Sequence, residues 1–345
     1  MSRQKSPPSK NPGDAAPRRT LMVTGPSLAQ GLLQLPALSS LAKANRATLL
    51  GSEEQMAVLD PSLLKWRLSH QGPESLSQPI SLEIGSTDAQ TLRRYDFSHA
   101  VFLGAHGSAS RKAARAGIPE RWGDLGWWRG RHLSHRVATA DEDHLSDSGQ
   151  QLLQNIDVPW DPQPLHVSET WQRTGKERLA SAKISTDESL VAVYVGNEGA
   201  LGGGLWPTEF FEELIQKLRR NDGRRRFLIL STDHDLWQSV LLFERTGKIH
   251  PVIGPDLNLD GLAGVLFHLD LVVAGDSSLL QLAYAVGAPT LGLYRKDSER
   301  CIPAESNRHQ ILERNPLKRL SVDEVAERCE AALAAKPGLP QGKPD

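Results

Sequence analysis

The 345-residue sequence has no long apolar run, and a transmembrane helix, which needs about 18 to 20 consecutive apolar residues, is therefore not predicted. The first 19 residues also lack the apolar segment of a secretory signal and are rich in Ser, Pro, Lys and Arg. This composition favours a disordered tail. The alternative is a weak contact with anionic lipid headgroups through five cations: Arg3, Lys5, Lys10, Arg18 and Arg19.

The chain also has few cysteines and almost no net charge. Cys301 and Cys329 are the only cysteines, and neither has a histidine at metal-ligand spacing, so we expect two free thiols in a reducing compartment. The 40 Lys and Arg residues nearly balance 41 Asp and Glu residues, which leaves a net charge of −1. This balance offers no global electrostatic reason to bind nucleic acid or an anionic membrane. Neither a metal site nor a bound cofactor is predicted.

The G-x-G-x-x-G fingerprint of dinucleotide-binding enzymes is missing throughout the chain, which argues against an oxidoreductase. Apolar strands and helices alternate instead, most regularly in the second half, and this pattern predicts a doubly wound parallel sheet. Strands are expected at 190–195, 226–230, 251–253, 271–274 and 290–294. Helices are expected at 207–221, 235–245, 259–269, 278–286 and 321–336. Pro207 suits the first helical position, and Ser321 with Glu324 matches a capping box.

Fewer strands and helices are predicted in the first half of the sequence. A strand at 21–23, a helix over 28–41 interrupted by Pro36, and a strand at 47–50 form a βαβ unit. A further strand at 100–103 precedes a basic, Ala-rich helix at 111–116. Prolines cluster around Trp160, where the pattern is lost. We therefore expect two Rossmann-like domains with this division: a tail at 1–19, a first domain at 20–165, a linker at 166–185, a second domain at 186–336 and a tail at 337–345.

Ligands of open α/β sheets bind beyond the carboxyl ends of the strands, and four such ends carry informative residues. The first is a glycine-rich loop whose backbone N–H groups suit a diphosphate, although a flexible surface loop is the alternative. Its candidate residues are Gly196, Asn197, Gly202, Gly203 and Gly204.

The second end is the turn Gly275-Asp276-Ser277-Ser278, where Asp276 either accepts hydrogen bonds from sugar hydroxyls or, like Ser277, caps the next helix. The third end is Arg295-Lys296, adjacent cations that either neutralise a diphosphate or form a solvated surface pair.

The fourth end follows the first strand and offers Thr24, Ser27 and Gln30. His106 and Ser108, after the strand at 100–103, either line the same cleft or belong to an ordinary loop.

Two other groups of residues favour structural roles. The runs Arg219-Arg220 and Arg224-Arg225-Arg226 are interpreted as a solvated face. Trp122, Trp127 and Trp128 either stack on a sugar or, as we favour, pack under a loop.

Several segments, taken in chain order, resemble the heptosyltransferases of glycosyltransferase family 9, which build bacterial lipopolysaccharide core. Residues 22–30 resemble the family's opening strand and S-L-G-D loop, and 35–38 resemble the T-P-A-L that follows. Residues 116–123 resemble A-G-I-P-x-R-x-G, and 205–207 resemble the end of K-x-W-P. Residues 271–289 resemble the N-D-S-G-x-x-H…A-x-G-x-P block.

This resemblance implies a GT-B fold, in which two Rossmann-like domains face a central cleft. It implies an ADP-heptose-like nucleotide-sugar donor held by the second lobe, with Gln281 at the family's His position among the donor-side residues. The acceptor would be a lipopolysaccharide-type, lipid-linked or other glycan at the first lobe. Transfer would be inverting and metal-independent. The protein would be cytoplasmic, with a peripheral contact at the inner face of the cytoplasmic membrane.

The sequence departs from the family at positions that carry chemistry. Gln30 stands at the catalytic Asp, and an amide cannot act as a base at neutral pH. Ala29 replaces the preceding glycine, and Gly204 replaces a phosphate-contacting lysine. Ser278 and Gln281 replace the Gly and His of the N-D-S-G-x-x-H block. Two hypotheses follow: a transferase with altered donor or catalytic machinery, and a relative that binds a nucleotide sugar or a glycan-assembly partner without catalysis.

Overall fold

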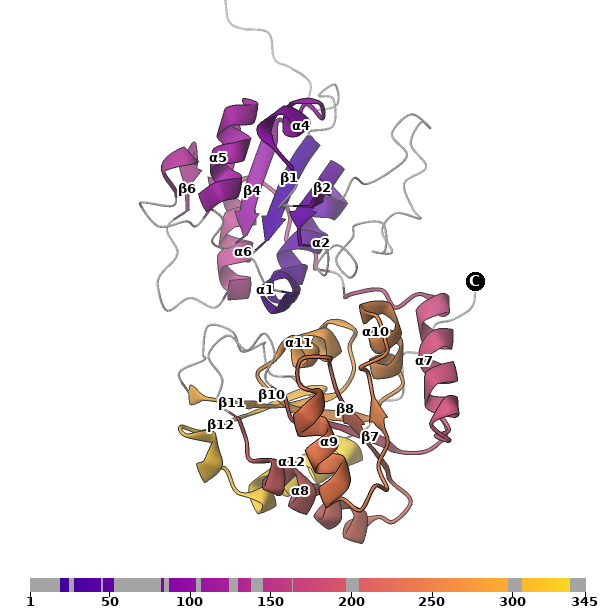
Figure 1. Cartoon of the computed structure of the whole chain (residues 1–345). Helices are drawn as coiled ribbons and strands as arrows, with labels where there is room; N and C mark the ends of the chain where they lie inside the picture. The colour runs from indigo at the N-terminus through magenta and orange to yellow at the C-terminus, as the bar shows by residue number, and fades with distance from the viewer. Residues whose placement is uncertain are drawn as a thin grey trace, which may run out of the picture.

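The computed structural model describes residues 19–24, 28–44, 46–52, 82–83, 87–103, 107–123, 130–137, 145–162, 164–196, 205–296 and 306–335. Within these ranges the chain forms two parallel sheets, each with six strands and each flanked by helices (Figure 1). The two sheets belong to two lobes that follow one another in sequence.

The first sheet has the strand order β3-β2-β1-β4-β5-β6. Its strands are β1 (Arg19–Thr24), β2 (Arg46–Gly51), β3 (Leu82–Glu83), β4 (His99–Leu103), β5 (Glu120–Gly123) and β6 (His135–Arg136). The helices of this lobe are α1 (Leu28–Leu33), α2 (Leu35–Ala44), α4 (Ala89–Arg93), α5 (Gly107–Ala116), the short 3-10 helix η3 (Gly130–His132) and α6 (Leu145–Asn155).

Side chains of the first sheet alternate between two buried faces, because successive residues of a strand point to opposite sides. Leu21 and Val23 pack with α4 and α5, whereas Met22 packs with α1, α2 and α6. A parallel sheet covered on both faces explains why these strands read as continuous apolar runs.

The second sheet has the order β12-β11-β10-β7-β8-β9. Its strands are β7 (Leu190–Tyr194), β8 (Arg226–Leu230), β9 (Val252–Ile253), β10 (Leu271–Gly275), β11 (Thr290–Tyr294) and β12 (His309–Glu313). The helices are α7 (Glu169–Ser181), α8 (Thr208–Asn221), α9 (Leu236–Arg245), α10 (Leu259–Phe267), α11 (Ser278–Ala285), the short 3-10 helix η5 (Leu317–Arg319) and α12 (Val322–Ala334).

The same alternation builds the core of the second lobe. Val191 and Val193 pack against α8 and α12, and Ala192 and Tyr194 face the side that α7, α10 and α11 cover. Cys329 of α12 is a free thiol in the hydrophobic cluster that contains Val191 and Val193, and burial there raises its pKa. Cys301 lies outside the described residues.

The two lobes meet through α1 and α11, which pack against each other (Figure 1). Leu28 and Leu32 of α1 share one hydrophobic cluster with Leu279 and Leu282 of α11. The backbone N–H of Leu165 donates to the carbonyl of Ala285 at 3.1 Å, so the segment between the lobes is also attached to α11.

Most of the linker expected at 166–185 is the helix α7, which lies along α10 (Figure 1). The two helices approach at Gly175 and Gly264, where a Cβ on either residue would lie under 3.0 Å from backbone of the other helix. Glycine is therefore required at this crossing for steric reasons.

Several predicted boundaries are confirmed and others are wrong by a few residues. The predicted interruption of the first helix is present, since α1 ends at Leu33 and α2 begins at Leu35. Pro207 is the N-cap of α8 and not its first helical residue, because its ψ of 139° is not helical. The basic helix α5 begins at Gly107, four residues before the predicted start. The elements that were not predicted are short or strongly polar: β3, α4, β5, η3, β6, α6, α7, β12 and η5.

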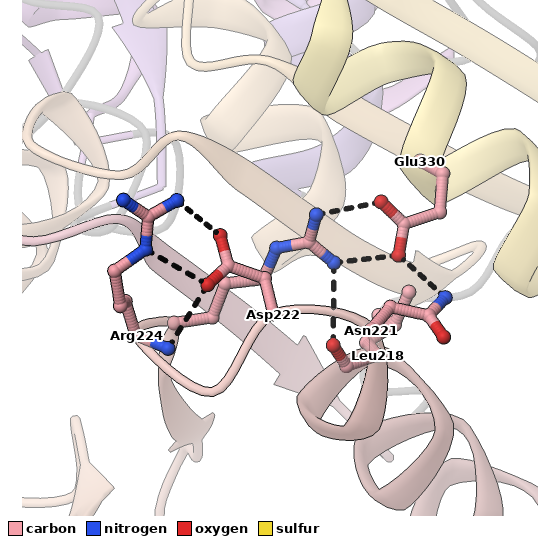
Figure 2. Close-up of polar contacts among 6 residues, drawn as sticks. Leu218, Asn221, Asp222, Arg224 and Glu330 are labelled. Carbon is pink, nitrogen blue, oxygen red and sulfur yellow. Dashed lines mark hydrogen bonds and ion pairs between the residues drawn. The ribbon is translucent and has the colours of Figure 1, made fainter.

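The expected solvated arginine face is only partly correct. Arg225 is mostly buried and forms two 2.6 Å hydrogen bonds with Glu330 of α12, whereas Arg224 is exposed and pairs with Asp222. Figure 2 shows Glu330 and Asn221 on one side of the turn and Arg224 with Asp222 on the other. The bidentate ion pair attaches the turn before β8 to α12.

The expected capping box at the start of α12 is half confirmed. Ser321 accepts a hydrogen bond from the backbone N–H of Glu324 at 3.2 Å. The Glu324 carboxylate accepts a hydrogen bond from Arg314 at 2.6 Å instead of turning back to the N-cap.

Candidate functional site

Both sheets change winding direction between the first and fourth strand of their lobe. In open α/β sheets this switch point, at the carboxyl ends of the strands, is where ligands bind. In the first lobe it lies between β1 and β4, where Thr24 pairs with Leu103. In the second lobe it lies between β7 and β10, where Tyr194 pairs with Ala274.

The candidates of the first lobe occupy different environments. Thr24 is fully buried at the end of β1, and Gln30 is half-buried on α1. Ser108 is exposed in the first turn of α5. Ser27 and His106 lie outside the described residues. Thr24 therefore supports the end of its strand, while Gln30 and Ser108 retain some access to solvent.

The turn between β10 and α11 holds the second group of candidates. Ser277 is the N-cap: its hydroxyl accepts from the N–H of Leu280 at 3.2 Å and donates to the carbonyl of Gly275 at 3.0 Å. Of the two residues considered for this cap, the structure selects Ser277. Asp276 is buried beside it, and Ser278 is half-buried at the first position of α11.

Gln281 lies one turn further along α11 and is buried. Its amide Nε2 donates to the hydroxyl of Tyr294, the last residue of β11, at 3.3 Å. A Cβ on Gly292 would lie under 3.0 Å from the Tyr294 ring, so this glycine provides space for the aromatic side chain. Arg295, half-buried, and Lys296, exposed, come directly after this strand.

The end of β7 leads into the glycine-rich segment. Gly196 is the last described residue before it, and Asn197, Gly202, Gly203 and Gly204 lie outside the described residues. Because Gly275 pairs with Leu293 and Ala274 with Tyr194, the turn that carries Asp276 lies between Gly196 and Arg295. Candidates from three neighbouring strand ends are thus brought to one edge of the sheet.

A buried polar cluster under this edge was not predicted. The Tyr194 hydroxyl donates to the Asp235 carboxylate, and both side chains are buried. Thr232 donates to the same carboxylate at 3.4 Å, and the Gln238 amide approaches it at 3.5 Å. Asp235 follows the carboxyl end of β8 and is the N-cap residue of α9. Asp276 was selected because it follows the carboxyl end of a strand. The same is true of Asp235, so this residue could have been found from the sequence.

Two of the motif residues have structural roles. Trp206 is buried, donates from its indole nitrogen to the carbonyl of Leu320 at 3.0 Å, and contacts Phe211 edge-on. Arg121 donates from Nε to the carbonyl of His132 at 2.6 Å, which connects β5 to η3.

The tryptophans considered for sugar stacking are only partly described. Trp122 stacks on His135 with ring centroids 4.0 Å apart, which agrees with packing. Trp127 and Trp128 lie outside the described residues.

Neither a metal site nor a membrane-spanning helix is present among the described residues. These residues contain no group of three or more His, Cys, Asp or Glu side chains placed to hold a metal ion. No helix among them combines the length and hydropathy needed to cross a membrane.

Comparison with known proteins assigns the family. The model of glycosyltransferase family 9 (heptosyltransferase) matches residues 92–328, more than half of the chain. This chain belongs to glycosyltransferase family 9. No curated protein matches it by sequence.

Several solved structures share the fold of this family 9 chain. A family 9 glycosyl transferase from Veillonella parvula has a TM-score of 0.74 at 16% identity, covering 92% of this chain and 98% of the other. The E. coli ADP-heptose lps heptosyltransferase II has a TM-score of 0.72 at 17% identity, with coverage of 92% and 98%. E. coli heptosyltransferase WaaC, solved with ADP-2-deoxy-2-fluoro heptose, has a TM-score of 0.63 at 18% identity, with coverage of 90% and 99%. The predicted GT-B fold is confirmed.

Proposed function

We propose that this family 9 chain is a cytoplasmic glycosyltransferase that moves a sugar from a nucleotide-sugar donor to a glycan acceptor. The donor is of the ADP-heptose type and binds at the carboxyl edge of the second sheet. The acceptor is a lipopolysaccharide-type or other lipid-linked glycan that approaches the first lobe from the inner face of the membrane.

The observation that carries this proposal is the contact between α1 and α11. The first helix bears Gln30, and the second begins at the turn of Asp276 and Ser277. The acceptor-side and donor-side candidates therefore lie on two helices that touch. Transfer requires both substrates to meet at one place, and the contact between these two helices supports a shared site.

The donor-side residues have distinct proposed roles. Ser278 and the backbone N–H groups at the start of α11 bind the diphosphate, which the positive end of the helix also stabilises. Arg295 supplies positive charge from the neighbouring strand, and Lys296 adds a second cation. Asp276 accepts hydrogen bonds from donor hydroxyls, while Gln281 holds Tyr294 beneath the turn.

The proposed reaction is an inverting displacement that uses no metal ion. The acceptor oxygen attacks the anomeric carbon and forms the new glycosidic bond, while the bond from that carbon to the diphosphate oxygen breaks. The nucleoside diphosphate leaves with the electron pair, and the proton of the acceptor hydroxyl passes to solvent water. General-base assistance to such a step contributes about 10²- to 10⁴-fold in rate. Gln30 can donate to or accept from the hydroxyl but cannot remove its proton, so slow transfer is expected.

A second candidate function follows from Gln30. Since Gln30 stands where the family has its base, a protein that binds a nucleotide sugar without transferring it is the alternative. This candidate keeps the donor-side roles of Asp276 and Ser278 and removes only the chemical step.

Thermal-shift titration with ADP, UDP, GDP and their sugar conjugates tests the donor site, because a ligand that binds only the folded chain raises its melting temperature. Donor hydrolysis and transfer are assayed in parallel. Asp276→Asn keeps the side-chain shape and should weaken donor binding, and Lys296→Gln should weaken it less. Gln30→Asp restores a carboxylate and should increase turnover without changing donor affinity.

The outcomes separate the two candidates. A melting shift with one nucleotide and measurable turnover supports the transferase. A shift without turnover, in both the parent and Gln30→Asp, supports the binding protein. No shift with any nucleotide contradicts both.

A further inference from the structure

A hollow of about 390 Å³ lies on the first lobe between α5 and η3. It is lined by Arg111, Ala114, Arg115, Arg131 and His132. Three arginine side chains and one histidine thus line a shallow, open hollow.

This hollow is separate from the proposed transfer site. Helix α5 starts after the carboxyl end of β4 and runs antiparallel to it, ending where Ile118 N–H donates to the Ala113 carbonyl at 3.2 Å. Arg115, in the last turn, therefore lies toward the amino ends of the strands. Figure 1 shows α5 and β6 at the outer edge of the first lobe, while α1 faces the second lobe.

The wall formed by η3 is held in place by Arg121. Its guanidinium donates to the carbonyl of His132 at 2.6 Å, to that of Pro119 at 2.9 Å and to that of Ile118. Arg131 in turn donates from Nε to Nε2 of His132 at 3.1 Å. The η3 backbone that carries Arg131 and His132 is thus hydrogen-bonded to β5 through Arg121.

Among the described residues, no carboxylate neutralises the positive charge of the hollow. Across the described ranges, no carboxylate lies within ion-pair distance of Arg111, Arg115 or Arg131. Glu120 of the adjacent strand is engaged by His135 at 3.1 Å. Burial, followed by the charges of the surrounding arginines, lowers the pKa of His132.

A second basic hollow, of about 270 Å³, shows the opposite arrangement. It lies in the second lobe, and two of its arginines are paired: Arg225 with Glu330 at 2.6 Å and Arg226 with Glu188 at 2.9 Å. Its arginine charges are partly paired within the fold, whereas the arginines between α5 and η3 have no carboxylate partner in the part of the chain that the structure describes.

We propose that the hollow between α5 and η3 binds a phosphomonoester group. A guanidinium donates two parallel hydrogen bonds to phosphate oxygens, and several cations together match the charge of a dianion better than that of a carboxylate. The phosphate belongs either to an anionic lipid headgroup or to a soluble phosphorylated molecule. Binding there brings an anionic ligand to the outer edge of the first lobe without occupying the cleft.

The test uses the full-length chain with ¹⁵N-labelled histidine and inorganic phosphate at constant ionic strength. Saturable binding should shift the His132 imidazole resonance and raise its pKa. The double variant Arg111→Gln/Arg131→Gln should weaken phosphate binding by about a hundredfold, since each of the two lost charged hydrogen bonds costs roughly a factor of ten. Arg220→Gln, an exposed arginine on α8, is the matched control and should leave the affinity unchanged.

Vesicles identify the source of the phosphate. Sedimentation with phosphatidylcholine vesicles containing phosphatidic acid, lost in the double variant and absent with phosphatidylcholine alone, assigns a lipid headgroup. Binding of glucose 6-phosphate without vesicle binding assigns a soluble ligand. The proposal is overturned if phosphate produces no saturable shift of His132, or if the double variant, folded by circular dichroism, binds phosphate as tightly as the parent.

Discussion

The hydroxyl of Tyr194 donates a hydrogen bond to the buried carboxylate of Asp235, and this bond joins the carboxyl ends of β7 and β8. Gly196, two residues after Tyr194, lies directly against the same carboxylate. A Cβ at this position would be under 3.0 Å from the Asp235 side chain. The start of the glycine-rich segment is therefore positioned by a carboxylate at the N-cap of α9, which follows the neighbouring strand β8.

Gly196→Ala tests this relationship. The added methyl group should displace Asp235 or the strand end and cost about 1–3 kcal/mol of unfolding free energy. If the glycine-rich segment binds the donor, nucleotide affinity should fall as well. Chemical denaturation and thermal-shift titration measure the two effects.

Gly223→Ala is the matched control, because a Cβ there meets no atom within 4 Å. It should leave both quantities unchanged. Equal stability of the two variants would show that Asp235 does not constrain Gly196.

The ion pair between Arg225 and Glu330 should contribute measurably to stability. Both carboxylate oxygens accept hydrogen bonds from the guanidinium, and these bonds lower the pKa of Glu330. Glu330→Gln should lower the free energy of unfolding by about 1–3 kcal/mol at pH 7. The difference from the parent should disappear as the pH falls below the range in which a carboxylate ionises.

Arg224→Gln is the control for that ion pair, because Arg224 is exposed and its partner Asp222 belongs to the same turn (Figure 2). Exposed pairs of this kind add little, so stability should not change. Urea denaturation of both variants across pH decides between a structural and a surface role.

A substitution at the crossing of α7 and α10 should cause a larger loss of stability. In Gly264→Ala the new Cβ would lie under 3.0 Å from the carbonyl of Trp171, and a backbone carbonyl cannot move without shifting the helix. We expect a loss of about 3 kcal/mol, measured by chemical denaturation. A loss no greater than that of Gly223→Ala would mean that the two helices separate easily.

His250 predicts a pH dependence of stability. Burial, with the nearby charges of Arg219 and Arg226, lowers its pKa to about 4. In the unfolded chain a histidine has a pKa of about 6.5, so protons bind the unfolded state first as the pH falls. The contribution of neutral His250 to the free energy of unfolding is intact above about pH 6.5. As the pH falls from there to about pH 4, this contribution declines by up to about 1.4 kcal/mol per pH unit.

His250→Gln removes that titration. Denaturation at pH 7 and pH 5 should show a smaller loss of stability in the variant than in the parent. Identical losses would show that His250 does not resist protonation in the folded chain.

The predictions from sequence were most accurate where local chemistry decides the structure. Apolar runs such as Leu190–Tyr194 were recognised because a strand covered on both faces needs them. Asp276 and Ser277 were placed correctly between a strand and a helix. The strand His309–Glu313 was not predicted, since it is an edge strand whose side chains are only partly buried.

Residues whose roles depend on distant partners were harder to predict. Arg225 looked like part of a solvated run until α12, more than 100 residues later, supplied Glu330. Tyr194 looked like core, and its hydroxyl acquired a role only when β8 brought Asp235 beside it. The hollow between α5 and η3 combines residues from two segments whose proximity no spacing rule indicates.

By itself, the sequence determined the alternation of strands and helices, the division into two lobes and the resemblance to family 9, because hydrophobic period and short motifs are local properties of the chain. It also determined that an amide stands at position 30. Only the tertiary structure decided which strand ends adjoin, which charges are paired and which remain unneutralised. The reason is that parallel strands are joined by crossovers, so residues far apart in sequence become neighbours through packing alone.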